Sequence, residues 1–310
     1  KVNGVIKNMT WILFLQLLLS ACSFTEEPAL CPYNVRLEYW YAGYPDENVL
    51  PMRVNNLQEF LFDEEGNLLR RLNLRGDSLL GHTDELSPGK YHIVVWGNLT
   101  DGNKVCTLGN ETKYEDMRLV ANRQADDYSE NTPRLYYAES ELDIRQKGMV
   151  FKRIYVTHCH ADLQITVMWR IAKPEFKDRL YMRMRGISSS YGFMEDYHFD
   201  APNEAGPYQI PLIENRLVAH ETSAAENYND EVVGEFISYR FTNSTHQLWS
   251  LWCGNEKVLG ELDLQRYFTR TTDMDYNVEQ EFHLLVIVEE DQIIVTEISG
   301  DDWEEGGIIG

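Results

Sequence analysis

Short segments in which apolar and polar residues alternate recur along this chain, and they constrain its fold more than any other feature. In residues 35–42, Val35, Leu37, Tyr39 and Tyr41 occupy alternate positions, and Arg36, Glu38, Trp40 and Ala42 lie between them. Alternation with a period of two places such side chains on one face of an extended strand. Gly, Pro, Asn and Asp separate these segments, and the 3.6-residue periodicity of long helices is scarce. The pattern therefore predicts a protein built from β-strands.

The predicted strands extend to the end of the chain. Leu57–Phe62 and Leu68–Leu74 flank a turn in which Gly66 suits a positive φ angle, so they are expected to form a hairpin. Within Tyr91–Gly97, the successive apolar residues Val94, Val95 and Trp96 indicate burial on both faces of that strand. Further strands are expected at Leu135–Ala138, Met149–Thr157, Asp162–Arg170, Leu180–Ile187, Val232–Phe241, Gln247–Trp252, Lys257–Leu264, Glu281–Val288 and Gln292–Ile298.

The spacing of these strands favours two domains. About seven strands in each half, with turn residues every 8 to 12 positions, are typical of a β-sandwich. The polar stretches Thr100–Thr132 and Asn203–Asn229 are expected to be long loops. We therefore expect an all-β fold of two tandem β-sandwich domains, residues 31–157 and 158–310, with the boundary just before the strand at Asp162.

The first residues have the composition of an export signal. Lys1 and Lys7 precede a short apolar run, Trp11–Leu19, which ends in Leu-Ser-Ala-Cys at Cys22. A positive segment, a short apolar segment and small residues before a cleavage site make up a secretory signal peptide; a buried core helix is the alternative. Leu-Ser-Ala-Cys also resembles a bacterial lipobox, which implies removal of residues 1–21 and acylation of Cys22. Residues 22–30 are then a lipidated tether, and we expect a lipoprotein exposed on the cell outer membrane.

The charge of the chain argues against some partners. Its 28 Lys and Arg residues stand against 50 Asp and Glu residues, which gives a net charge of -22. Such a surface repels a phosphate backbone and anionic lipid surfaces alike, so nucleic acid is not an expected partner.

Four cysteines remain once Cys22 is assigned to lipid. Cys31, Cys106, Cys159 and Cys253 allow two disulfides in three connectivities, and the sequence does not choose between them. Since Cys31 and Cys106 fall in the first expected domain and the other two in the second, we expect pairing within domains. The chain has no Cys-x-x-Cys pair, the usual thiolate spacing of zinc sites, and no cofactor is expected.

One segment is a candidate metal site. His158, His160 and Asp162 share one face of a strand, which is a possible ligand arrangement. Leu163 stands where the corresponding hydrolase motif needs a further histidine. We therefore favour polar residues at a domain junction over a metal site. Since Gly-x-Ser-x-Gly and a Gly-rich phosphate loop are also absent, we expect no catalytic residues and no enzyme.

The order of motifs resembles one family, the FimB-like lipid-anchored anchor subunits of Bacteroidetes-type (type V) fimbriae. The similarity rests on the lipobox, Cys31-Pro32 before the first strand, the Glu59–Gly66 hairpin, Leu86–Gly97, Leu135–Ala138 and the strand Asp162–Trp169. It implies transthyretin-like Greek-key sandwiches, a structural role in fimbrial assembly and adhesion, and pilin subunits as partners. The segment His158–Ala161 departs from the family pattern. A surface glycan-binding lipoprotein is the alternative, suggested by Trp249, Trp252 and Trp303.

The end of the chain is a candidate contact with the fibre. Gln292–Ile298 is strand-like, and the segment from Gly300 to Gly310 carries a few apolar residues. An exposed sheet edge or a detachable terminal strand binds another subunit by β-strand addition. The alternative is that this tail completes its own sandwich.

Overall fold

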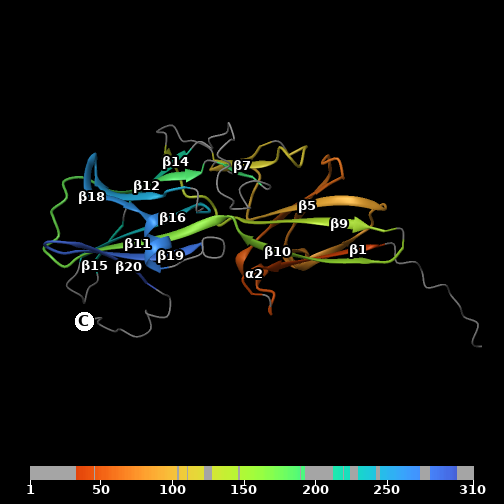
Figure 1. The fold of residues 1–310 in the computed structure, drawn as a ribbon, viewed down its shortest axis with the longest axis horizontal. Helices are drawn as coiled ribbons and strands as arrows, with labels where there is room; N and C mark the ends of the chain where they lie inside the picture. The colour runs from red at the N-terminus through yellow and green to blue at the C-terminus, as the bar shows by residue number, and fades with distance from the viewer. Residues whose placement is uncertain are drawn as a thin grey trace, which may run out of the picture.

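The computed structural model describes residues 33–44, 46–102, 105–109, 111–121, 128–145, 147–188, 190–192, 212–218, 220–223, 230–241, 245–272 and 280–298. Strands dominate these residues, which confirms the all-β class expected from the sequence. The α-helices among them, α2 (Leu50–Arg53) and α3 (Leu264–Tyr267), have four residues each. The strands are arranged in two units that lie end to end along the longest axis of the molecule (Figure 1).

The N-terminal unit is a two-layer sandwich. Its strands are hydrogen-bonded in the order β3-β2-β5-β9-β10-β1-β4, and β9 and β10 pair at two positions, where the four-stranded layer passes into the three-stranded layer. The strands are β1 (Val35–Tyr41), β2 (Leu57–Phe62), β3 (Leu68–Leu74), β4 (Gly81–Asp84), β5 (Gly89–Gly97), β9 (Tyr136–Ile144) and β10 (Val150–His158).

The alternation predicted for the first strand fills the core between these layers. The alternate residues of β1 are buried, and they pack in one apolar cluster with residues of the facing strands. This cluster includes Val35, Leu37, Tyr39, Leu57, Leu61, Ile93, Val95, Leu142, Ile154 and Val156. The β2–β3 hairpin has the expected turn, in which Gly66 has a φ of 74° and the Asp63 carboxylate accepts the Asn67 N–H at 2.7 Å.

The C-terminal unit is built from two five-stranded sheets. One has the order β15-β16-β11-β19-β20 and the other β18-β17-β12-β14-β8. Their strands are β8 (Tyr128–Ser129), β11 (His160–Trp169), β12 (Leu180–Ser188), β14 (Leu212–Val218), β15 (His220–Ser223), β16 (Asp230–Tyr239), β17 (Leu248–Cys253), β18 (Glu256–Asp263), β19 (Glu281–Val288) and β20 (Ile293–Glu297). Buried residues of both sheets form one cluster, among them Leu163, Ile165, Val167, Met182, Met184, Phe236, Trp249, Leu251, Leu284 and Val286.

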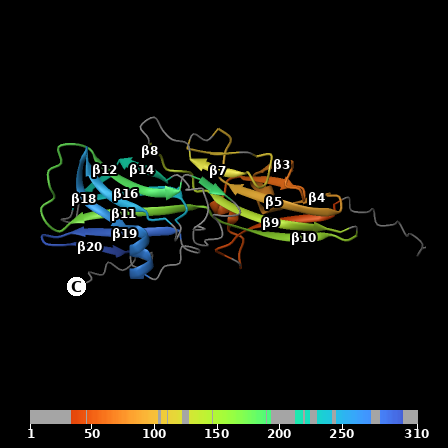
Figure 2. The same cartoon turned by 45° about the horizontal axis from the view of Figure 1, so that its top comes forward.

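The prediction that two polar stretches form long loops was wrong in part. Thr100–Thr132 contains β6 (Cys106–Leu108), β7 (Arg118–Ala121) and β8, and Asn203–Asn229 contains β14 and β15. A third sheet joins β6 and β7 with β13 (Ser190–Gly192), a segment that follows β12. Figure 2 shows β7 beside the N-terminal unit. These strands are short and pair with distant segments, so their own sequences give little local signal.

The units are connected through one extended stretch of chain. β10 ends at His158 and β11 begins at His160, and the two strands follow each other along the long axis (Figure 1). The buried cluster of the C-terminal unit also includes Phe60, Val94 and Trp96, which face away from the N-terminal core. Apolar packing therefore continues from one unit into the other.

Candidate functional sites

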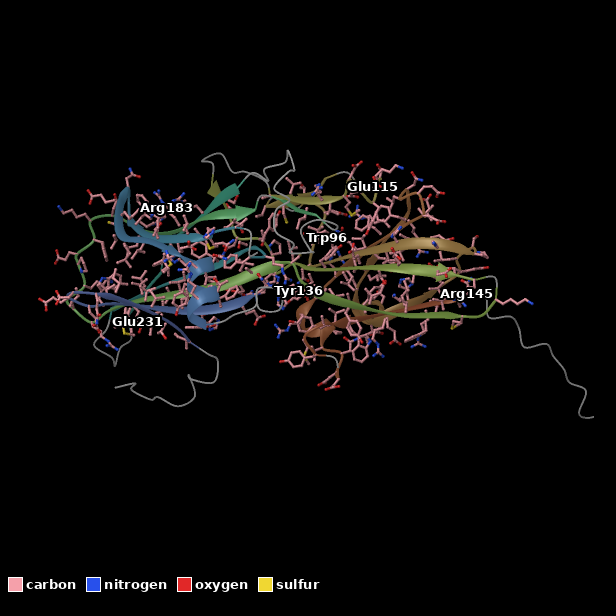
Figure 3. The ribbon with its side chains drawn as sticks, viewed as in Figure 1. Trp96, Glu115, Tyr136, Arg145, Arg183 and Glu231 are labelled. Carbon is pink, nitrogen blue, oxygen red and sulfur yellow. The ribbon has the colours of Figure 1, made fainter. Side chains whose placement is uncertain are left out.

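A chain of hydrogen-bonded aromatic and histidine side chains lies where the two units meet. His160 Nδ1 donates to the Leu135 carbonyl at 2.6 Å, because a carbonyl oxygen only accepts. In a neutral imidazole, Nε2 of His160 then accepts from Nδ1 of His158, 3.4 Å away. Nε2 of His158 in turn accepts from the Tyr41 hydroxyl at 2.5 Å. Tyr136, labelled in Figure 3, packs its ring against both imidazoles.

Both imidazoles are held neutral. Burial lowers the pKa of His158 to about 4, helped by the charges of Arg53 and Arg240. Burial lowers the pKa of His160 to about 3, helped by the charge of His158. The junction is therefore a structural contact that depends on uncharged imidazoles.

Ion pairs between the units surround this buried chain. Arg53 of α2 pairs with Glu281 of β19 at 3.2 Å, and its guanidinium lies 5.3 Å from the centre of the Tyr41 ring. Arg134 pairs with Asp162 at 2.7 Å and with Glu235 at 2.6 Å. Polar residues thus join the end of one sandwich to the beginning of the next.

The three candidate metal ligands do not converge on one point in the structure but bind to different partners. His158 and His160 contact each other, but the Asp162 carboxylate pairs with Arg134. Within the described ranges, no group of three His, Cys, Asp or Glu residues is arranged to hold a metal ion. The interpretation as polar residues at a junction matches this arrangement.

The expected disulfide of the second domain is not formed. Cys106, Cys159 and Cys253 are present as thiols, and Cys31 lies outside the described residues. Cys159 is fully buried beside the start of β11, whereas the Cys253 thiol contacts the Asp178 carbonyl, beyond the end of that strand. Ten residues of extended chain span about 33 Å, which far exceeds the reach of a disulfide.

The lipidation site, Cys22, and the whole signal segment also lie outside the described residues. The part of the chain that is described contains no helix long and apolar enough to cross a membrane. Lipidation of Cys22 therefore stays a prediction.

A buried carboxylate that the sequence did not single out ties the N-terminal sandwich together. Glu59 of β2 has no exposed side-chain surface, and it hydrogen-bonds the Tyr39 hydroxyl of β1. His82 of β4 approaches the same carboxylate at 2.6 Å and Arg70 of β3 at 3.3 Å. Arg70 also pairs with Asp84 of β4. The cluster links β2 and β3 of one layer to β1 and β4 of the other.

The strand predicted near the end of the chain lies at a sheet edge. β20 pairs with β19 and is the terminal strand of its sheet. Ile293 at its start is 53% exposed. The tail after residue 298 lies outside the described residues, so its role stays a prediction.

These features define an elongated all-β protein in which polar clusters join the strands and the two units. Several solved structures have the same fold. A proposed adhesin from Bacteroides thetaiotaomicron matches with a TM-score of 0.67 at 15% identity, over 86% of this chain and 97% of that one. A proposed polysaccharide-binding protein of the same species matches with a TM-score of 0.63 at 12% identity, over 86% and 98%. The fimbrial anchor protein Mfa2 from Porphyromonas gingivalis matches with a TM-score of 0.61 at 14% identity, over 86% and 95%.

The family is established by sequence. The model of the fimbrillin-A associated anchor proteins Mfa1 and Mfa2 matches residues 27–248, which is more than half of the 310 residues. The chain therefore belongs to this family of fimbrial anchor proteins, which confirms the resemblance found in its motifs. No curated protein sequence matches it.

Proposed function

We propose that this protein is the lipid-anchored subunit that holds a fimbrium on the bacterial outer membrane. Membership of the anchor-protein family carries the proposal. Acylation of Cys22 supplies the membrane attachment, since several acyl chains hold a protein far more firmly than one. The role is structural and requires no catalytic step.

The arrangement of the units supports this role. β1 follows the tether in the sequence, and the chain then passes through the hydrogen-bonded junction into the C-terminal unit (Figure 1). That unit places β20 at the edge of its sheet, and a sheet edge is where another strand can be added. One end is thus suited to the membrane and the other to fimbrial subunits.

The glycan-binding alternative receives less support from the tryptophans that suggested it. Trp249 is 1% exposed and belongs to the core. Trp252 lies between Arg183 and Lys257, whose charged groups are 4.0 and 5.1 Å from its ring centre. Trp303 lies outside the described residues. The two described rings therefore already have partners.

Replacing the predicted lipidated residue tests the attachment. The variant Cys22→Ala should be released from the membrane fraction or keep its signal peptide, and the fimbriae should detach from the cells. Cys253→Ala, at a partly exposed thiol of the C-terminal unit, is the matched control and should fractionate as the unmodified protein does. Normal processing and membrane retention of Cys22→Ala would contradict the proposal.

Deleting residues 299–310 tests strand donation by the tail. The truncated protein should remain membrane-bound and folded but should lose wash-resistant fimbriae, because strand addition supplies the contact through backbone hydrogen bonds. A variant in which the same residues are replaced by Gly and Ser keeps the length of the tail and so separates the effect of its sequence from the effect of its length. If the truncated protein still holds full-length fimbriae, the pilin contact lies elsewhere.

A further inference from the structure

An exposed apolar group lies at the end of the N-terminal unit, beside the first described residues. Tyr33, Met149 and Phe151 are 46%, 54% and 53% exposed. They are neighbours, because the Val150 N–H donates to the Asn34 carbonyl at 2.8 Å as β10 begins beside β1. Single exposed apolar residues are ordinary, but three gathered at one end of the unit indicate a contact surface.

This turn is basic in an acidic protein. Residues 145–153 contain four basic residues and no acidic residue, whereas the whole chain carries a net charge of -22. Arg145 and Lys147 are exposed in the turn between β9 and β10, and neither forms an ion pair with any residue in the described ranges. Figure 3 places Arg145 at the far end of the unit.

Acidic side chains also lie near the turn. Asp143, in β9, lies opposite Lys90 in the β5–β9 ladder, and Glu85 follows β4. Glu38 pairs with Arg36 at 3.1 Å and with Arg153, one of the four basic residues, at 3.6 Å. Arg36 lies opposite Phe151 in the β1–β10 ladder. Charges more than about 10 Å away are largely screened at ordinary salt concentration. The charge at the turn is therefore set by its four basic residues and these near neighbours, rather than by the acidic surfaces farther along the molecule.

The position of the turn indicates what it contacts. Ten residues separate Cys22 from Tyr33, so the predicted lipid lies at most about 40 Å from this end of the unit, even with the tether fully extended. The far end of β11 is separated from this turn by the lengths of both β10 and β11 along the long axis (Figure 1). The basic turn is thus the exposed basic and apolar surface held nearest to the bilayer, if the tether is lipidated as proposed above.

We propose that the basic turn, defined as Tyr33, Arg145, Lys147, Met149 and Phe151, docks on the anionic lipid surface in which the protein is anchored. Arg145 and Lys147 contact phosphate groups, and the three apolar side chains enter the boundary between headgroups and acyl chains. This second contact holds the elongated molecule in one orientation on the membrane, which a flexible lipid tether alone does not do.

The test uses the mature chain from residue 22 with Cys22→Ser, so that no lipid contributes to binding. Its partitioning is measured by co-sedimentation with sucrose-loaded vesicles of phosphatidylcholine, alone or mixed with phosphatidylglycerol. Binding should require phosphatidylglycerol and should weaken as salt is raised. Arg145→Ala with Lys147→Ala should lower the partition coefficient about 25-fold, at about fivefold for each basic residue near the surface. Met149→Ser with Phe151→Ser should also lower it.

Matched changes at the opposite end of the molecule serve as controls. Lys177→Ala with Arg179→Ala, and Ile171→Ser, alter exposed residues of the loop between β11 and β12 and should leave binding unchanged. The proposal is overturned if binding does not depend on phosphatidylglycerol, or if the turn variants bind as the controls do. Because the chain tested has no lipid, either result is independent of whether Cys22 is acylated in cells.

Discussion

At the scale of single residues, Glu59 shows how a polar side chain becomes part of a core. Alternation places Glu59 on the same face of β2 as Leu57 and Leu61, which belong to the N-terminal core. A buried carboxylate is costly unless it is paired and hydrogen-bonded. Tyr39, His82 and Arg70 satisfy it from three other strands, so the cost is offset by a link between the layers.

The charge of His82 should make this link depend on pH. Burial lowers the pKa of His82, but the hydrogen bond and negative charge of Glu59 outweigh burial and raise the pKa above its ordinary value. Because the folded pKa is raised, the stabilisation is complete below pH 6.5 and is lost as the pH rises through the folded pKa.

The variant His82→Asn should therefore lower the free energy of unfolding at pH 6 by about 1.5 to 3 kcal/mol, the contribution of a charge-assisted hydrogen bond. The loss should be smaller at pH 9. Urea unfolding at both pH values measures it. In a Glu59→Gln background the pH dependence should disappear, and an equal loss at both pH values in the original background would contradict the assignment.

At the scale of elements, the close approach of two strand backbones limits which side chains fit between them. Gly81 begins β4 with a φ of 144°, and a Cβ added there would collide with the Leu37 carbonyl of β1. β4 carries His82 and Asp84, so this approach also places the partners of Glu59 and Arg70. Glycine supplies the required conformation without strain.

The variant Gly81→Ala should lower the free energy of unfolding by about 1 to 3 kcal/mol, since both its φ angle and the collision oppose the side chain. Gly260→Ala in β18 is the matched control, because its added Cβ meets no atom within 4 Å. Its effect should be small, as the loss of unfolded-state entropy favours alanine. Urea unfolding compares the two, and equal losses would show that β4 yields to the new methyl group.

At the scale of the whole molecule, the junction determines whether the two units behave as one body. His158 and His160 are buried and neutral there, facing Arg53, Arg134, Arg240 and Glu281. A fimbrial anchor under tension benefits from a firm connection between its two units. The hydrogen-bonded histidines and the continuous apolar cluster both supply it.

The junction should weaken in acid. Because the folded pKa values are lowered to about 4 and about 3, the stabilisation is complete above pH 6.5 and is lost as the pH falls through these values. His158 alone accounts for a loss on the order of 3 kcal/mol, at about 1.4 kcal/mol per pKa unit. Titration of the imidazole resonances by NMR measures both pKa values. Values near 6.5 for both histidines would show that the junction is open to water.

The sequence by itself determined the features that depend on the pattern of neighbouring residues. The bounds of β2, β3 and β19 agree with the predicted strands and those of β1 agree to within one residue, because a period of two and a turn glycine act over a few residues. The all-β class and the family follow from the same repeated signals in their order along the chain. The burial of both faces of β5 was also foreseen, and Val94, Val95 and Trp96 have no exposed surface.

Only the tertiary structure decided which distant residues meet. It gave Glu59 its partners, separated Cys159 from Cys253, paired Asp162 with Arg134 and joined β7 to β13. Each of these contacts depends on the pairing and curvature of strands far apart in the chain, which a local pattern does not contain. The short strands within the predicted loops were missed for this reason, since their partners rather than their own residues stabilise them.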